Sequence, residues 1–373
     1  MRYFFSTGEP SGELVAVALA REIRALDPEA TFEGIGSARM REAGFAIWRD
    51  NQGWASIGPI AAIPRIPKLA HAMFRTAAHV AKTAPDLVVL IDFGAFNLRL
   101  AKALRGRHRY EGPILDCLPP SAWTDREKAA RTVASLAVPL TAFRRQYEFY
   151  ERLGLPVAYF GHPLAPGYVP RARRPAPPLD GGTIALLPGS RRGEITRLLP
   201  RLLDAYRLLR ETRPRLRAVV AAADDASERT IRAVARRAGS ADLPVVRGLQ
   251  AATADADAAW IASGTAVLEA VLSGVPAIAL YALAPALLPL AKRLMRSPWI
   301  TLPNLVLDDA VIPELLQDAA TPEMLAYTMD ATLRDPSYQY DAFERLRKAL
   351  GPDDALVSWA KFAVSLAVAG KAR

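Results

Sequence analysis

The chain has 373 residues, of which 51% are hydrophobic and 23% are charged. This composition excludes a disordered chain, a collagen-like chain and a small disulfide-rich module. The single cysteine, Cys117, excludes an internal disulfide and a thiolate metal cluster, and it favours a reducing cytosol. Because the chain exceeds the size at which one hydrophobic core stops growing, we expect two domains.

The charge balance is basic, with 48 Lys and Arg against 38 Asp and Glu and a formal net charge of +10. Such a balance suits phosphate-bearing small molecules or an anionic membrane, and no nucleic-acid-binding motif is present. The four histidines form no close His/Cys pair, so we expect no metal site and no cofactor. The N-terminus has no signal-sequence pattern, and no apolar run approaches the roughly 20 residues of a membrane span. We expect a soluble protein, or one that lies on a membrane.

Short aliphatic runs alternate with helical patterns along the chain. In the first half, strands are predicted at residues 3–6, 32–35, 86–91, 114–118 and 136–140, with helices at about 14–26 and 96–104. In the second half, strands are predicted at 183–187, 218–222, 244–246, 258–261 and 277–281, with helices at about 195–210, 227–238 and 266–273. This alternation predicts an α/β fold with parallel sheets.

A stretch rich in proline and arginine, residues 163–178, interrupts the pattern and is typical of a linker. We therefore predict a first Rossmann-like domain at 1–165, a linker at 166–180 and a second Rossmann-like domain at 181–350. Residues 351–373 are predicted to form a C-terminal helix that could pack back on the first domain. Ligands of parallel sheets bind at the carboxyl ends of the strands, so a cleft between the domains is the expected site.

The first candidate loop, residues 8–13, follows the first strand and opens a helix. A glycine-rich helix entry offers unpaired N–H donors and is a ready anion site. Gly8, Ser11 and Gly12 are the candidate ligand-binding residues, and Ser11 is also a plausible N-cap. Because Gly and Ser mark most strand-to-helix turns, the alternative is an ordinary turn.

The second candidate loop, residues 186–194, places Ser190, Arg191 and Arg192 between a strand and a helix. Positive side chains are mildly unfavourable beside a helix N-terminus. A bound diphosphate would compensate for them, whereas the alternative leaves both arginines simply in solvent.

The third candidate loop, residues 262–269, contains Gly264 and Thr265 before a helix and Glu269 about one turn inside it. A glycine lets a ligand approach the backbone closely. The carboxylate of Glu269 can accept two hydrogen bonds from ribose hydroxyls. The alternative is a glutamate that reaches back to cap its own helix.

Two basic, apolar stretches, residues 63–82 and 282–299, are candidates for an anionic interface. The alternative for each is a helix whose apolar face packs on the core and whose charged rim is solvated.

The order of the motifs resembles the lipid-A-disaccharide synthase family, which is glycosyltransferase family 19 and has the two-domain GT-B fold. Similar stretches run nearly end to end, at residues 8–13, 34–40, 91–100, 120–123, 161–163, 186–191, 262–269 and 302–305. The resemblance implies two Rossmann-like domains with parallel sheets that face a central cleft. It also implies metal-independent transfer of a diacylated glucosamine from UDP to the 6-hydroxyl of an acylated glucosamine 1-phosphate. The family works at the cytosolic side of the membrane, so the resemblance implies a cytoplasmic, peripheral protein on the inner face of the cell membrane.

Residue roles follow from the same resemblance. Ser190 and Arg191 would meet the diphosphate, with Gly264 and Thr265 at a helix N-terminus. Glu269 would bind the ribose, and Asn304 would lie near the nucleotide. The first domain, with Gly8, Ser11 and Gly12, would hold the acceptor.

Asp92 stands where the family has its catalytic aspartate. A carboxylate at the carboxyl end of a strand can take the proton of an attacking hydroxyl, and this general-base help is typically worth roughly a hundred- to ten-thousand-fold. The alternative is that Asp92 caps the helix that begins near Phe96.

The sequence departs from the family pattern in its first domain. Ala95 replaces a second acid, so that no other carboxylate of this loop stands beside Asp92. Thr124 and Asp125 follow Trp123 where a second tryptophan is usual, and Glu13 replaces an aspartate. Residues 57–62 lack the usual acid after Gly58. A related UDP-sugar transferase with another lipid or glycan acceptor, or a non-catalytic nucleotide- or lipid-binding relative, therefore remains an alternative.

Overall fold

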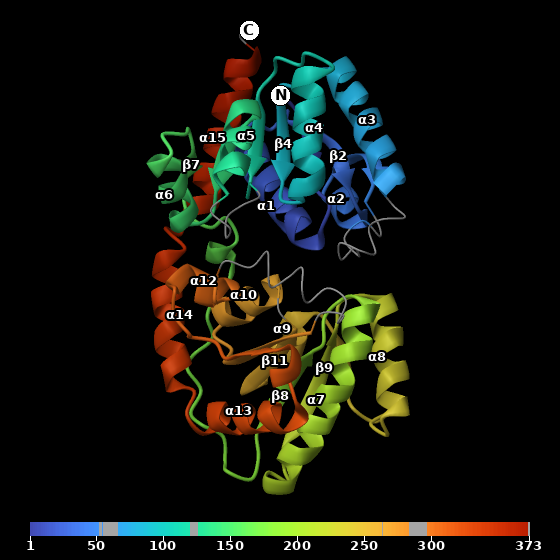
Figure 1. Ribbon diagram of the computed structural model, residues 1–373, viewed down its shortest axis with the longest axis vertical. Helices are drawn as coiled ribbons and strands as arrows, with labels where there is room; N and C mark the ends of the chain where they lie inside the picture. The colour runs from blue at the N-terminus through green and yellow to red at the C-terminus, as the bar shows by residue number, and fades with distance from the viewer. Residues whose placement is uncertain (52–53, 55–65, 120–125, 263, 283–296, 372–373) are drawn as a thin grey trace. The chain divides into compact units, whose positions relative to one another are not determined.

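The computed structural model describes residues 1–51, 54, 66–119, 126–262, 264–282 and 297–371. It divides into two compact units (Figure 1). The first unit is Met1–Gly167 together with Leu350–Arg373, and the second is Tyr168–Ala349. Each unit contains one parallel sheet, which confirms the predicted α/β class with two Rossmann-like domains.

The sheet of the first unit has seven strands in the order β3-β2-β1-β4-β5-β6-β7, and every pair is parallel. The strands are β1 (Arg2–Ser6), β2 (Thr31–Gly36), β3 (Ala46–Asp50), β4 (Leu87–Ile91), β5 (Ile114–Cys117), β6 (Val138–Thr141) and β7 (Ala158–Tyr159). All five residues of β4 are buried, as expected for a strand that helices cover on both faces.

Helices cover both faces of this sheet. They are α1 (Pro10–Leu26), α2 (Ala38–Glu42), α3 (Ile66–Thr83), α4 (Gly94–Gly106), α5 (Glu127–Leu136), α6 (Arg144–Arg152) and α15 (Ala355–Lys371), with a short 3-10 turn at Ala165–Gly167. Helix α15, drawn in red in Figure 1, packs against α1. Within the first part of α15, Trp359 Nε1 donates a hydrogen bond to the carbonyl of Gly161 at 3.0 Å. The C-terminal helix therefore belongs to the first unit.

The sheet of the second unit has six strands in the order β10-β9-β8-β11-β12-β13, again all parallel. The strands are β8 (Thr183–Leu187), β9 (Arg217–Ala222), β10 (Val245–Arg247), β11 (Ala258–Ala262), β12 (Ala277–Tyr281) and β13 (Glu314–Leu316). The helices are α7 (Arg192–Thr212), α8 (Asp225–Arg237), α9 (Leu249–Thr253), α10 (Thr265–Leu272), α12 (Leu302–Leu307), α13 (Pro322–Arg334) and α14 (Ser337–Ala349), with a 3-10 turn at Gln317–Ala319.

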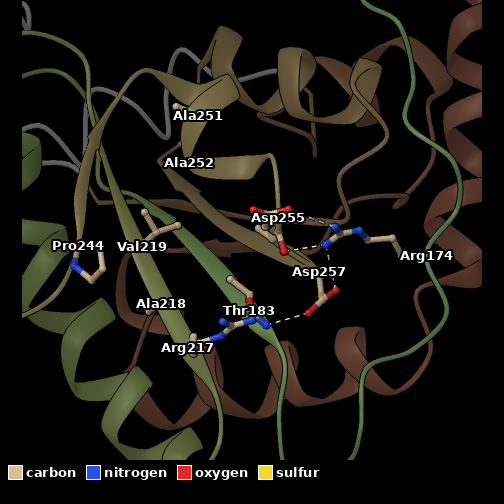
Figure 2. Close-up of a pocket in the computed structure, with 11 residues that line it drawn as sticks. Arg174, Thr183, Arg217, Ala218, Val219, Pro244, Ala251, Ala252, Asp255 and Asp257 are labelled. Carbon is tan, nitrogen blue, oxygen red and sulfur yellow. Dashed lines mark hydrogen bonds and ion pairs between the residues drawn. The ribbon is translucent and has the colours of Figure 1, made fainter.

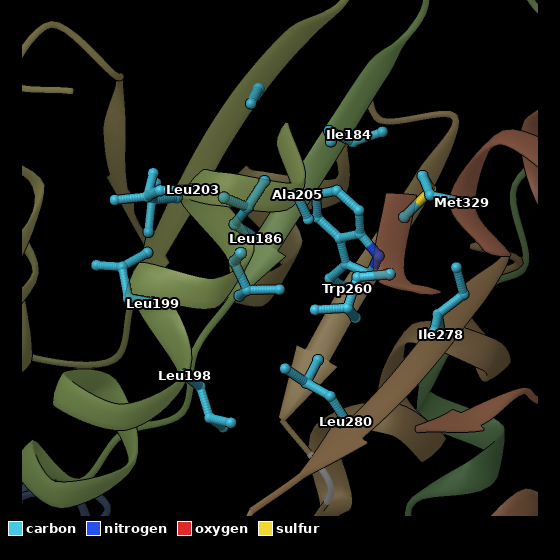
Figure 3. Close-up of a cluster of buried hydrophobic side chains, with 14 of the residues drawn as sticks. Ile184, Leu186, Leu198, Leu199, Leu203, Ala205, Trp260, Ile278, Leu280 and Met329 are labelled. Carbon is cyan, nitrogen blue, oxygen red and sulfur yellow. The ribbon is translucent and has the colours of Figure 1, made fainter. Parts of the chain in front are cut away.

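One core of this unit lies between its sheet and the helices α7 and α13 (Figure 3). Trp260 of β11 is fully buried there, against aliphatic side chains of neighbouring strands and of α7. Burying each large apolar side chain contributes roughly 1.5–3 kcal/mol. This packing fixes the carboxyl ends of β8 and β11, from which two of the candidate loops leave.

The predicted linker is tied to the second unit from Tyr168 onward. The Arg171 backbone N–H donates to the Ser273 carbonyl at 3.2 Å, and the Arg171 guanidinium donates to the Gly274 and Thr253 carbonyls at 3.1 Å each. Arg174 lies 3.4 Å from the carboxylate of Asp257. The segment from Tyr168 to Gly182 contains no helix or strand, and these hydrogen bonds and the ion pair hold it against the second unit.

Several predicted elements are corrected in their bounds. Helix α1 begins at Pro10, four residues before the predicted start, because a proline at the first helical position is favourable. The predicted strand at 136–140 begins instead at Val138, since Leu136 closes α5. Strands β3 and β13 were not predicted; they lie at the edges of their sheets, where burial and hence apolar patterning are weaker.

Among the helices of the described residues, none has the length and apolar character needed to cross a membrane. Most of the predicted basic stretch at 282–299 lies outside the described residues, as does the start of the stretch at 63–82. Its remainder forms α3, which buries Met73, Ala77 and Val80 and exposes Lys68 and Phe74.

Candidate functional site

The two sheets share one topological feature. In each, the strand order reverses between two neighbouring strands, β1 and β4 in the first unit and β8 and β11 in the second. The carboxyl ends of such a pair are where parallel sheets bind ligands. All three candidate loops, and Asp92, follow one of these four strands. The topology therefore places every one of these candidates at a binding edge.

The loop after β1 leads directly into α1. Glu9 is the N-cap residue and Pro10 the first helical residue, so Ser11 lies inside the first turn and is not the N-cap that we predicted. Gly12 faces β4, and a Cβ built on it would lie 3.5 Å from the carbonyl oxygen of Ile91. The helix therefore packs close to β4 at this point.

Gly8 is required for a reason that the sequence did not indicate. A Cβ at this position would lie 2.2 Å from Cγ of Phe93, so the aromatic ring occupies the space that we expected a ligand to approach. Phe93 also stacks with Trp54 at a centroid distance of 6.1 Å. The glycine thus lets the loop after β4 lie on the loop after β1.

Asp92 follows β4 immediately and is half-buried. Both Asp92 (φ 50°) and Phe93 (φ 49°) adopt the left-handed conformation, which is uncommon for residues other than glycine and worth noting at a candidate site. Burial raises the pKa of Asp92, and a hydrogen bond from the Phe93 backbone N–H partly opposes this rise. Helix α4 begins at Gly94 with Phe93 as its N-cap and without a side-chain cap.

Asn97, which lies in a matched motif but had no predicted role, ties the two strand ends together. Its amide donates to the carbonyl of Asp92 at 2.7 Å, and its Oδ1 accepts from the hydroxyl of Ser6 at 2.6 Å. Both side chains are fully buried. These bonds hold the backbone of Asp92 at a fixed position relative to β1.

A second carboxyl, Asp116, was missed by the sequence reasoning. It lies in β5, next to β4, and is 2% exposed. Burial, together with the charge of Asp92, raises the pKa of Asp116 to about 8. The signal was an aspartate inside an otherwise aliphatic strand, Ile114–Cys117.

Glu13, the departure from the family pattern in α1, is buried and fully engaged. Its carboxylate accepts from the hydroxyl of Ser37 at 2.5 Å and from the amide of Asn51 at 2.8 Å. The Asn51 amide also contacts Thr7, at 3.4 Å from its hydroxyl. Glu13 therefore connects the chain after β1, β2 and β3, which is a structural role. Ala95 is exposed in the first turn of α4, and residues 57–62 and 120–125 lie outside the described residues.

In the second unit, the loop after β8 turns at Gly189, whose φ is 100°. A Cβ there would lie 2.6 Å from Oε2 of Glu194, so a glycine is needed. Ser190 and Arg191 are both exposed at the start of α7. The Arg191 guanidinium lies 3.2 Å from the carboxylate of Glu194. This pair partly offsets the positive charge beside the helix N-terminus.

The loop after β11 places Gly264 and Thr265 at the exposed N-terminus of α10. The space beside Gly264 is open, since a Cβ there would meet no heavy atom of the described residues within 4 Å. Glu269 is half-buried, and the hydroxyl of Tyr168 is hydrogen-bonded to its side chain. The N-cap residue of α10 is Gly264, which has no side chain to cap the helix, and the nucleotide-binding and capping roles of Glu269 both stay predictions.

Asn304, which is predicted to lie near the nucleotide, has its side chain held within the protein. It is fully buried in α12, and its amide donates to the carbonyl of Ile312 at 2.8 Å and to Glu314 at 2.9 Å. Its Oδ1 accepts from the Ile312 backbone N–H at 2.8 Å. Both amide hydrogens are thus used within the protein, and Asn304 shapes the segment Thr301–Glu314 instead of offering a donor to a ligand.

A cavity of about 460 Å³ lies elsewhere in this unit (Figure 2). Thr183 and Arg217, which line it, are the first residues of β8 and β9. Arg174 and Asp257 form an ion pair on its wall. Because the cavity is at the amino ends of the strands, it is not the site that the loops define. No group of three or more His, Cys, Asp or Glu side chains within the described part of the chain is placed to hold a metal ion.

Comparison with known proteins agrees with the sequence resemblance. The family model described as lipid-A-disaccharide synthetase matches residues 3–352. A lipid-A-disaccharide synthase of Pseudomonas paraeruginosa is 34% identical over 361 residues, which are 95% of each chain. One of Geobacter sulfurreducens is 34% identical over 345 residues, covering 90% of this chain and 89% of the relative.

Solved structures show the fold. Acinetobacter baumannii MurG has a TM-score of 0.56 and 16% identity, with 98% of this chain and 99% of that chain covered. The UDP-GlcNAc 2-epimerase of Neisseria meningitidis, bound to UDP-GlcNAc, has a TM-score of 0.63 and 9% identity, with 98% and 99% covered. The fold is therefore GT-B, and the chain belongs to the lipid-A-disaccharide synthase family of glycosyltransferases.

Proposed function

We propose that the protein transfers a diacylated glucosamine from UDP to the 6-hydroxyl of an acylated glucosamine 1-phosphate and releases UDP. The proposal rests on which groups lie at the two points where the strand order reverses. One holds a carboxylate, Asp92, and the other holds two exposed helix N-termini with Arg191 beside one of them. A proton acceptor and an anion site are the two devices that this transfer needs.

The donor is proposed to bind the second unit. Backbone N–H groups at the starts of α7 and α10 suit the diphosphate, since a helix N-terminus carries partial positive charge. Ser190, Arg191, Gly264 and Thr265 are exposed there. Glu269 is proposed to accept hydrogen bonds from the ribose, while Asn304 maintains a nearby segment without touching the nucleotide.

The acceptor is proposed to bind the first unit, near the loop of Gly8, Ser11 and Gly12, with Asp92 as the general base. As the acceptor oxygen attacks C1 of the donor sugar, its proton passes to the Asp92 carboxylate. The C1–O bond to the β-phosphate breaks on the opposite face, and its electron pair leaves with UDP. The product therefore has inverted configuration at C1. Positive charge at Arg191 and the helix N-termini stabilises the developing charge on UDP.

For the acceptor, a second candidate is supported by features of the first unit. Phe93, next to Asp92, is partly exposed and stacks on the buried Trp54, and Ala95 removes the second acid of the family pattern. These features support a related lipid or glycan acceptor as the second candidate. A non-catalytic nucleotide-binding relative is the third outcome of the test.

The test is formation of product from a UDP-linked acylated glucosamine whose sugar carries a heavy isotope. The purified protein is offered acylated glucosamine 1-phosphate in one reaction and a mixed lipid extract in another. Labelled disaccharide in the first reaction supports the proposal. Label transferred only in the second supports the alternative acceptor. UDP binding without transfer in either reaction would refute catalysis, and Asp92→Asn serves as the blank.

We also propose that the protein acts at the inner face of the membrane, where its acylated substrates lie. Helix α3 supports this, since it exposes Phe74 together with Lys68, Arg75 and Lys82. The expected result is binding to anionic vesicles that weakens as salt is added. Phe74→Ser with Lys68→Ser should reduce that binding, and retention in the supernatant at low salt would contradict the proposal.

A further inference from the structure

Asp116 and Asp92 lie near each other at the carboxyl end of the first sheet. Asp116 of β5 is paired in register with Leu90 of β4, and Asp92 comes two residues after Leu90. The Asp92 backbone N–H donates to the carbonyl of Cys117, the residue after Asp116, at 3.0 Å. Side chains paired across neighbouring strands point to the same face of a sheet, so Asp116 shares a face with Leu90. Leu90 and Ile114, the residues in phase with Asp116, pack in the core with Phe96 of α4. The Asp116 side chain therefore lies on the sheet face that α4 covers, and its strand is hydrogen-bonded to the backbone of Asp92.

The environment of Asp116 does not stabilise a negative charge. The residue is 2% exposed, and its Oδ1 has no hydrogen-bond partner. An ionised carboxylate that is buried without a partner costs several kcal/mol, so such a group keeps its proton. Burial is the larger cause of its raised pKa, and the negative charge of Asp92 is the second. The two acids are therefore coupled, because a negative charge on Asp92 favours the protonated form of Asp116.

The charged groups of the surrounding elements are directed elsewhere. The guanidinium groups of α4 donate to backbone carbonyls, Arg99 to Ala95 and Arg105 to Leu136, and Lys102 is exposed. On α5, Arg131 pairs with Glu127, and Lys128 is exposed. Strand β6 has the residues Val-Pro-Leu-Thr and no titratable side chain. On β5 itself, burial raises the pKa of the Cys117 thiol, which stays neutral. Among the described residues, Asp92 is thus the charged group that raises the pKa of Asp116.

We infer that Asp116 is a positioning residue for the proposed base: it carries a proton behind Asp92, so that Asp92 bears the single negative charge of this edge. The inference rests on the proposed role of Asp92. When Asp116 loses its proton, the added negative charge makes protonated Asp92 more favourable. Asp92 then becomes a stronger base, and proton transfer from the acceptor hydroxyl becomes easier.

The test is the pH profile of kcat in the wild-type enzyme and in Asp116→Asn. The amide resembles the protonated acid in shape and charge, so the two enzymes should agree within about twofold at pH 6.5, and this agreement also shows that the variant is folded. Between pH 7 and 9, wild-type kcat should rise several-fold, whereas that of Asp116→Asn should stay flat. Cys117→Ala is the matched control in the same strand and should keep the wild-type rise. A wild-type profile without the rise, or the same rise in Asp116→Asn, would overturn the inference.

A second measurement separates this inference from the proposed function. Aspartate labelled with carbon-13 at its carboxyl gives a resonance for Asp116, assigned by its loss in Asp116→Asn. Its titration midpoint should be near pH 8 in the wild type and lower in Asp92→Asn, where the neighbouring charge is absent. If Asp92→Asn keeps normal kcat while this midpoint moves, the proposed base is wrong and the coupling stands. If the midpoint does not move, the coupling is wrong whatever the activity of Asp92→Asn.

Discussion

The two strand-order reversals have the same topology but carry opposite kinds of charged group, half-buried or buried acids in the first unit and exposed positive charge in the second. At the reversal of the first unit, the ionisable groups are the acids Asp92 and Asp116, and burial raises the pKa of both. At the reversal of the second unit, Arg191 and two helix N-termini are exposed, and Glu194 partly balances them. Under the proposed function, the first reversal is the proton-accepting edge and the second is the anion-binding edge.

This difference predicts that turnover and nucleotide binding respond to different solution conditions. Burial shifts pKa values, so the first unit should make turnover depend on pH. Exposed charges are screened by salt, so the second unit should make nucleotide binding depend on ionic strength. The following variants test this division, beginning with the largest expected effect.

Asp92→Asn should break the proton-accepting edge. The amide keeps the shape and loses the basicity, so kcat should fall by at least about a hundredfold. UDP affinity, measured by calorimetry, should not change, because the proposed nucleotide loops belong to the other unit. Near-normal kcat on the true acceptor would show that the base lies elsewhere.

His162 extends the comparison to stability. It is buried, its Nδ1 accepts from the Leu164 backbone N–H at 3.3 Å, and burial lowers its pKa to about 4. The unfolded chain binds a proton at this group near pH 6.5 while the folded protein does not. The free energy of unfolding should therefore fall by between about 2 and about 3 kcal/mol as the pH drops from 6.5 to 4. Urea titrations of the wild type and of His162→Gln measure this, and equal slopes in both would contradict it.

Arg191→Ala tests the anion-binding edge. Loss of a charge-assisted hydrogen bond to the diphosphate should weaken UDP binding by about tenfold or more at low salt, and by less at high salt. Glu269→Ala should weaken it as well, with little salt dependence. Arg232→Ala, which removes an exposed arginine paired with Glu228 on α8, is the matched control and should bind UDP normally. Unchanged affinity in both Arg191→Ala and Glu269→Ala would remove the nucleotide assignment.

Tyr168→Phe should have the smallest effect. Its hydroxyl is hydrogen-bonded to Glu269, so its loss should leave that carboxylate less well oriented for a ribose. UDP affinity should fall by less than about tenfold, and affinity for a 2′,3′-dideoxy analogue of UDP should not change. An equal loss with both nucleotides would indicate that Tyr168 acts on the fold and not on the ribose contact.

Much of the fold was predictable from the sequence because strands buried on both faces have an unmistakable pattern. Strands β8 and β12 have the predicted bounds, and β4 differs by one residue. The identity of the loops was also accessible, since each combines glycine with a strand before it and a helix after it. What the sequence could not show was which loops lie next to each other in space.

The rest depended on contacts between residues that are distant in the chain. The sequence left Asp92 as the lone acid of its loop, but Asp116 approaches it from the next strand. Asn304 has a polar side chain in a matched motif, yet its hydrogen bonds to Ile312 and Glu314 are visible only in the folded chain. Gly8 stays a predicted ligand-binding residue, and its close approach to the Phe93 ring is visible only in the folded chain.

The contact between Gly8 and the Phe93 ring also constrains how this enzyme can evolve. Any side chain at position 8 would collide with the ring, so a single change there should displace the segment that carries Asp92. A smaller residue at position 93 must come first, after which position 8 is free to vary. The two positions are therefore expected to show strong epistasis, and the order of mutation decides whether a lineage passes through an inactive intermediate.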